Sequence, residues 1–154
     1  MKYLIVFTVV LATFGACQPN DHDDVVPAIE MTAGTAFPTN CATVYRGESF
    51  EFNAVFTDNV ELGSYSIEMH HNFDQHTHST DAEQCTPDPV KQAVVPFRLI
   101  ANYPLPSGLQ RFEAKQTIFI PEDVDTGMYH FMVRLTDAAG WQIFKGISVR
   151  IADR

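Results

Sequence analysis

The chain has 154 residues, with 19 acidic against 10 basic side chains and a formal net charge of −9. This balance argues against nucleic acid and anionic lipid surfaces as partners, because both carry charge of the same sign. An acidic balance is compatible with cation binding, although it does not establish it.

The first residues have the layout of an export signal. A lysine precedes an apolar run, and small residues follow before Cys17. The run is too short to span a membrane. A cysteine directly after Phe14-Gly15-Ala16 resembles the lipobox of bacterial lipoproteins, in which the chain is cut before the cysteine and that cysteine is lipidated. Residues 1–16 are therefore expected to be a lipoprotein signal peptide, with an ordinary secretion signal as the alternative.

Residues 17–26 are expected to be the lipidated Cys17 and an acidic tether, since the segment is polar and has no apolar periodicity. Acidic residues just after the cysteine also resemble the surface-export signals of Bacteroidetes lipoproteins. The expected location is the outer membrane, with the domain exposed at the cell surface or otherwise in the periplasm. The membrane contact is through the lipid anchor only.

Alternation of apolar and polar residues predicts strands in the remaining domain, residues 27–154. The clearest stretch is 49–56, with apolar residues at even positions, and 64–70 repeats the pattern. No stretch has helical spacing with caps. The other candidate strands are 116–120, 128–136 and 141–151, with weaker ones at 29–32 and 94–100. About seven short strands of this kind are typical of a β-sandwich.

One motif makes the predicted sandwich immunoglobulin-like. The order Asp125-x-Gly127-x-Tyr129 matches the tyrosine corner at the start of strand F. Phe131 then stands where antibody domains carry their second cysteine, so the inter-sheet disulfide of that family is absent. The side chains expected to form the core in its place are Phe50, Phe52, Phe56, Ile67, Phe131 and Val133.

Two cysteines remain in the domain, Cys41 and Cys85. Disulfides persist outside the cytoplasm, so the two could be bonded to each other. Alternatively, Cys85 could be a thiolate ligand, because it follows a cluster of histidines by seven residues. The sequence leaves both roles open.

That cluster lies in residues 69–78, MHHNFDQHTH, which hold four of the six histidines of the chain. If 64–70 is strand C and 128–136 is strand F, the two strands are antiparallel neighbours. His70 and His130 then meet at one end of the domain, both on its outer face. A His-rich loop leaves strand C beside them. The predicted metal ligands are His70, His71, His76, His78 and His130, with Asp74 and Asp81 as further ligands or as acceptors that orient a ring.

Zinc or copper is the metal expected at such a site. Imidazole donors suit zinc, copper(II) and nickel, and zinc needs nothing beyond the histidines. Met128 and Met132 flank His130 on the outward face, where their sulfurs would help to hold copper(I) or would simply cover the sheet. The alternative is a polar surface loop that binds nothing or responds only to pH.

Several of these motifs together resemble a family of Bacteroidetes lipoproteins catalogued as a domain of unknown function. They are the lipobox, the acidic tether, the strand entry at 58–67, the H-x-F-D-x-H-x-H run at 71–78 and T-G-x-Y-x-F-x-V-x-L-T-D at 126–137. The resemblance covers nearly the whole mature chain. It implies an immunoglobulin-like fold and an envelope location, and it brings no established activity. The residues it singles out are His71, Phe73, Asp74, His76 and His78.

No enzyme is expected, and no catalytic residue stands out. The chain offers no nucleophile with an adjacent base and no acid/base pair of carboxylates. The ligand type resembles that of copper-zinc superoxide dismutase, without its glycine-rich loop and ligand order, which leaves metal-dependent redox activity a remote alternative. The prediction is a metal-binding lipoprotein that captures, buffers or transfers its ion. The alternative is a metal-independent adhesion module for a protein or glycan partner, with Tyr103 and Trp141 as candidate contact residues.

Overall fold

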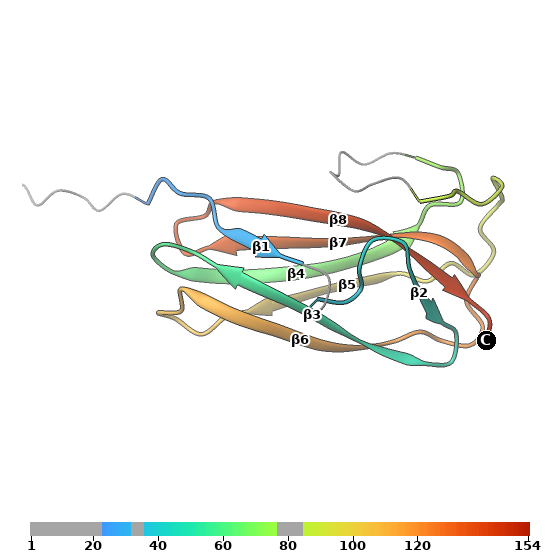
Figure 1. The fold of residues 1–154 in the computed structure, drawn as a ribbon, viewed down its shortest axis with the longest axis horizontal. Coiled ribbons are helices and arrows are strands. Elements are labelled where there is room, and N and C mark those ends of the chain that lie inside the picture. Colours follow the sequence, from blue (N-terminus) through green and yellow to red (C-terminus); the bar gives the residue numbers. More distant parts are fainter. Residues whose placement is uncertain (1–22, 32–35, 77–84) are drawn as a thin grey trace, which may run out of the picture.

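The structure, a computed structural model, describes residues 23–31, 36–76 and 85–154. These residues form an immunoglobulin-like β-sandwich without helices, so no described helix could cross a membrane (Figure 1). One sheet has the strand order β1-β3-β6 and the other the order β2-β8-β7-β4-β5. The strands are β1 (Ala28–Glu30), β2 (Ala42–Tyr45), β3 (Ser49–Thr57), β4 (Leu62–His71), β5 (Leu99–Pro104), β6 (Arg111–Phe119), β7 (Gly127–Asp137) and β8 (Gln142–Ala152).

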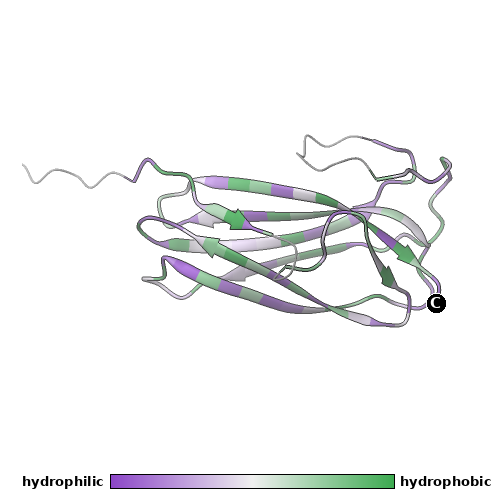
Figure 2. Ribbon diagram, viewed as in Figure 1, coloured by the Kyte–Doolittle hydropathy of each residue, from purple (hydrophilic) through white to green (hydrophobic). Residues whose placement is uncertain are grey.

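The core lies between the two sheets and follows the predicted alternation. Inward side chains of β3, β4 and β7 are completely buried, among them Phe52, Ile67 and Phe131 at 0% exposure. Figure 2 shows the same pattern as alternating hydrophobic and hydrophilic bands along the strands. Of the six side chains expected in the core, five are buried, and Phe50 packs against them while partly exposed.

Strands β4 and β7 are antiparallel neighbours, as predicted for strands C and F. Their register runs from Leu62 opposite Asp137 at one end to His71 opposite Tyr129 at the other, with His70 opposite His130 one position before that end. The tyrosine corner is also confirmed, because the Tyr129 hydroxyl donates to the carbonyl of Asp125 at 2.6 Å. Burial raises the pKa of Tyr129 to about 12.

Three predictions of local structure were wrong. Residues 94–98 are not a strand, because the amides of Val94 and Val95 donate to the carboxylate of Asp125 instead of to a ladder. Strand β2 was not predicted, and it pairs in parallel with β8. Strand β6 begins at Arg111, five residues before the predicted start. The sandwich therefore has eight strands in its described part.

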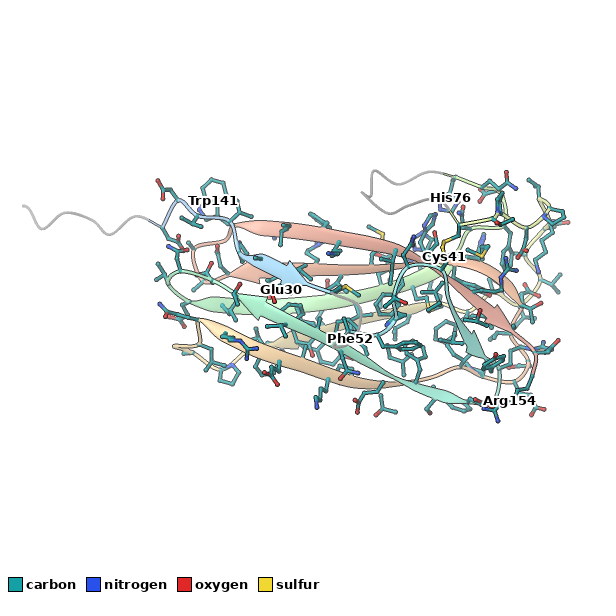
Figure 3. All side chains as sticks on the ribbon, in the orientation of Figure 1. Glu30, Cys41, Phe52, His76, Trp141 and Arg154 are labelled. Carbon is teal, nitrogen blue, oxygen red and sulfur yellow. A yellow bond between two sulfur atoms is a disulfide. The ribbon has the colours of Figure 1, made fainter. Side chains whose placement is uncertain are left out.

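The structure joins Cys41 to Cys85 through a disulfide, with their Cα atoms 5.6 Å apart. Of the two roles considered for Cys85, the structure therefore contains the disulfide, and a bonded sulfur is not a thiolate ligand. The bond ties the segment that returns from the histidine loop to the residue before β2. It also fixes this segment beside the end of the sandwich that carries the histidines (Figure 3).

Candidate metal centre

Three imidazole rings gather on the outer face of the five-stranded sheet. His70 on β4 and His130 on β7 lie opposite each other in the strand register, and their ring centroids are 5.4 Å apart. His76, from the loop after β4, completes the group, with centroids 5.5 Å from His70 and 5.0 Å from His130. Three imidazoles bound to one zinc ion in tetrahedral geometry have centroids about 5 Å apart. The spacing of the rings thus fits ligands of a single ion.

The loop brings His76 back over the sheet because two residues fix its path. Phe73 is 4% exposed and packs edge-on against Tyr129, with centroids 5.3 Å apart. Gln75 has a φ of 58°, in the left-handed region, and its amide donates to the carbonyl of Asn72 at 3.3 Å. The chain therefore turns just before His76. In Figure 3 His76 lies at the same end of the sandwich as Cys41.

The Nε2 atoms of His70 and His76 face each other and are 3.4 Å apart. With zinc–nitrogen bonds of 2.0–2.1 Å, two nitrogens of a tetrahedral site are about 3.3–3.4 Å apart. The same separation would also allow a weak hydrogen bond between the rings if one Nε2 carried a proton. The protonation of the two rings therefore decides what the pair can do.

Carboxylates beside the other nitrogens bear on that protonation. Oδ1 of Asp74 is 2.5 Å from Nδ1 of His76, and this hydrogen bond lowers the pKa of the Asp74 carboxyl. Oε1 of Glu68 is 3.2 Å from Nδ1 of His70, an ion-pair distance without hydrogen-bond geometry. Both carboxylates favour a proton on the neighbouring Nδ1. In the neutral tautomers, two Nε2 lone pairs then face each other, which is unfavourable unless a cation or a hydrogen-bond donor lies between them.

His130 connects the sheet to the loop. It points to the outer face, as predicted, but the loop covers it and leaves it 8% exposed. Its Nε2 is 3.2 Å from the carbonyl oxygen of His76, so the ring donates to that oxygen through Nε2–H. In this tautomer Nδ1 is the nitrogen with a lone pair. Met128, predicted to lie on the same outward face, is buried at 7% exposure.

His71 lies apart from the three rings. It shares the inward parity of Met69, and its ring packs against Phe73 with centroids 4.9 Å apart. Among the described contacts its buried Nδ1 has no hydrogen-bond partner. A cleft of about 450 Å³ opens beside it, lined by Glu68, His70, His71, Pro96, Phe97 and Arg98. The cleft gives solvent a route to the edge of the His70 ring.

Three sequence-predicted site residues, Cys17, His78 and Asp81, lie outside the described residues. Glu68 was not predicted, although a signal for it existed. It stands two positions before His70 on the same strand, and the alternation that turns His70 outward also turns Glu68 outward. Asp74 was predicted as an acceptor that orients a ring, and the structure places it against His76.

Comparison with known proteins assigns the chain to a family but does not indicate an activity. No curated protein matches the chain. A solved structure, the sporulation control protein Spo0M from Bacillus subtilis, aligns with a TM-score of 0.45 and 8% identity, over 84% of this chain and 51% of that one. This chain thus spans about half the length of that protein. A family profile described as "Domain of unknown function (DUF4625)" matches residues 15–152, nearly the whole chain. The chain therefore belongs to the DUF4625 family.

Proposed function

We propose that this protein is a cell-envelope lipoprotein that binds zinc or copper through His70, His76 and His130, for capture, buffering or transfer of the ion. The observation that carries the proposal is the 3.4 Å separation of the His70 and His76 Nε2 atoms, each on a ring whose Nδ1 faces a carboxylate. Metal-binding histidines commonly have such a carboxylate on the other nitrogen, where it fixes the tautomer and increases ligand basicity.

A metal ion resolves the electrostatics of this pair better than a proton does. A shared proton would charge one ring and leave the second ring as a neutral acceptor. A divalent cation uses both lone pairs and also balances the negative charges of Asp74 and Glu68. His130 would join through Nδ1, because its Nε2 is engaged with the carbonyl of His76. His78 remains a further candidate ligand from the sequence.

The metal is proposed to exchange with the surroundings. His76 belongs to a loop and its side chain is 34% exposed, while the cleft of about 450 Å³ reaches the edge of His70. An ion held only for structural reasons is usually enclosed by four protein ligands. Zinc suits the nitrogen donors, and the Irving–Williams order favours copper(II) at the same ligands.

The envelope location is proposed from the sequence. The lipobox at Cys17 supports a lipid anchor, and the acidic residues after it support export to the cell surface. The resemblance to Bacteroidetes lipoproteins with an H-x-F-D-x-H-x-H segment supports a surface or periplasmic location. The competing function is a metal-independent adhesion module. Of its two candidate aromatic residues, Tyr103 stacks on Tyr65 with centroids 4.7 Å apart, so one face of this ring is already covered. Trp141 is 43% exposed.

The test is titration of zinc and copper(II) by calorimetry, with His76→Ala and His70→Ala as the test variants. His71→Ala is the matched control, since it removes an adjacent imidazole whose ring packs elsewhere. We expect a dissociation constant of about 1 μM or lower, weakened at least about tenfold in both test variants and nearly unchanged in the control. Absence of binding by either metal at millimolar concentration would refute the proposal and favour the adhesion module. Binding that is retained in both test variants would show that His70 and His76 are not the ligands.

A further inference from the structure

Three carboxylates gather at the opposite end of the sandwich from the histidines. Asp23 precedes β1, Asp58 follows β3 and Asp137 ends β7. One oxygen from each lies within 4.8 Å of the others. In Figure 3 this end is marked by Trp141, whose Nε1 donates to the carbonyl oxygen of Asp23 at 2.9 Å. The chain thus brings together residues that are far apart in the sequence.

Asp58 and Asp137 each use only one carboxylate oxygen to hold a turn. Oδ2 of Asp58 accepts hydrogen bonds from the amides of Val60 and Glu61, both at 2.8 Å. Oδ1 of Asp137 accepts from the amides of Gly140 and Trp141 at 2.7 and 2.8 Å. Hydrogen bonds that are common in turns therefore account for one of the two oxygens of each carboxylate.

The other oxygens of these two residues are buried and unsatisfied. Oδ1 of Asp58 and Oδ2 of Asp137 are out of contact with solvent and have no hydrogen-bond partner among the described residues. Asp137 is only 3% exposed. Within the described part of the chain, no lysine or arginine forms an ion pair with Asp23, Asp58 or Asp137. A buried carboxylate oxygen without a donor or counter-charge is unfavourable, so these two oxygens are suited to bind a cation.

The neighbouring residues hold the carboxylates in place. Asn59 donates from its side chain to Oδ1 of Asp23 at 3.1 Å, which links Asp23 to the loop that carries Asp58. Gly63 lies against the backbone of Asp137, where an added Cβ would be 2.6 Å from the carbonyl oxygen. A glycine at this position therefore permits the close approach of β4 to the end of β7.

We propose that Asp23, Asp58 and Asp137 form a calcium site. Calcium binds oxygen ligands at 2.3–2.6 Å, so two oxygens on the same ion are at most about 5 Å apart, which the three carboxylates satisfy. The donors are all hard oxygens, unlike the nitrogens of the histidine site. The unsatisfied oxygens of Asp58 and Asp137 are the ligand atoms, and water completes the coordination, as is usual for calcium. This proposal is independent of the proposed function.

The test is thermal unfolding of the protein with EDTA and with calcium. Extracellular calcium modules bind with dissociation constants of about 10⁻⁴–10⁻³ M, so about 10 mM calcium should raise the Tm by about 5 °C. Asp137→Asn and Asp58→Asn should remove this rise, because the amide oxygen can still accept the turn hydrogen bonds while the ligand oxygen is lost. Asp123→Asn, at an exposed position, is the control with the same change of charge and should keep the rise.

The Tm values measured in EDTA distinguish a variant that has lost a calcium ligand from one that is misfolded. In EDTA both test variants should unfold at a higher temperature than the wild type, because the substitution removes an unbalanced buried charge. His76→Ala should leave the calcium response unchanged. The proposal is overturned if calcium does not raise the Tm of the wild type, or if the rise persists in both test variants. An equal rise with magnesium would overturn the assignment to calcium.

Discussion

Tyr129→Phe tests how the tyrosine corner stabilises the domain. The hydroxyl donates to the carbonyl of Asp125 at 2.6 Å and accepts from the amide of Phe97 at 3.2 Å. The side chain of Tyr129 is 0% exposed, so removal of the hydroxyl leaves these two backbone groups without this partner. A loss of about 1–3 kcal/mol in the free energy of unfolding is expected at neutral pH.

The same substitution should change the response to alkali. Burial raises the pKa of Tyr129 from its usual value of 10.0 to about 12, because the folded state disfavours the phenolate. The associated stability is fully present below pH 10.0 and is lost as the pH rises through 12. A rise of this size corresponds to at most about 2.7 kcal/mol. The stability advantage of the wild type over Tyr129→Phe should therefore shrink between these two pH values and nearly vanish at the upper one.

Urea unfolding of both proteins, from neutral pH to about pH 12, measures this difference directly. Subtracting the two curves removes the titration of the other tyrosines. Tyr103→Phe is the control, because the Tyr103 hydroxyl makes none of the described hydrogen bonds. A difference between wild type and Tyr129→Phe that stays constant with pH would refute the assigned origin of the raised pKa.

Three further predictions concern the histidine end of the domain. Replacing Cys41 and Cys85 with serine removes a crosslink between positions that are 44 residues apart, and should lower the free energy of unfolding by about 4 kcal/mol. A loss under about 1 kcal/mol in urea unfolding would contradict this. Phe73→Ala removes a ring that is 4% exposed, so it should cost about 3 kcal/mol and weaken zinc binding, whereas Phe73→Leu should retain most of both. The hydrogen bond with His76 lowers the pKa of Asp74. The stability that this bond contributes is therefore present above the ordinary carboxyl pKa of 3.8, and is lost as the pH falls through the lowered pKa of Asp74. In an NMR titration, His76→Ala should return the pKa of Asp74 toward 3.8, and an unchanged pKa would argue against this pairing.

The fold was largely predictable because its long strands alternate without interruption. The boundaries of β3, β4, β7 and β8 lie within two residues of those expected from period-two alternation. Strand β2 was not predicted because four residues are too few to show a period, and because its parallel pairing with β8 depends on distant residues. Residues 94–98 were misassigned because two of their apolar side chains are exposed: Val94 is 80% and Val95 is 46% exposed.

Only the histidines on paired strands could be placed from the sequence. The pairing of β4 with β7 brings His70 and His130 together, and that pairing follows from the tyrosine corner. The place of His76 depends instead on the left-handed turn at Gln75 and on the anchoring of Phe73, which spacing alone does not reveal.

The three clustered aspartates gave no sequence signal. Asp58 and Asp137 each read as an ordinary turn residue, and only the folded chain shows that an oxygen of each remains unsatisfied.

The register of β4 also sets how far the two ends of the domain lie from each other. From Leu62 to His70 the strand extends about 27 Å. Asp23, which accepts a hydrogen bond from Trp141, lies at the end of the sandwich remote from His76 (Figure 3). A domain held through its N-terminal side would carry the carboxylates at its base and the imidazoles at its free tip. A protein that delivers or removes a metal could then dock end-on at that tip, without approaching the surface to which the domain is attached.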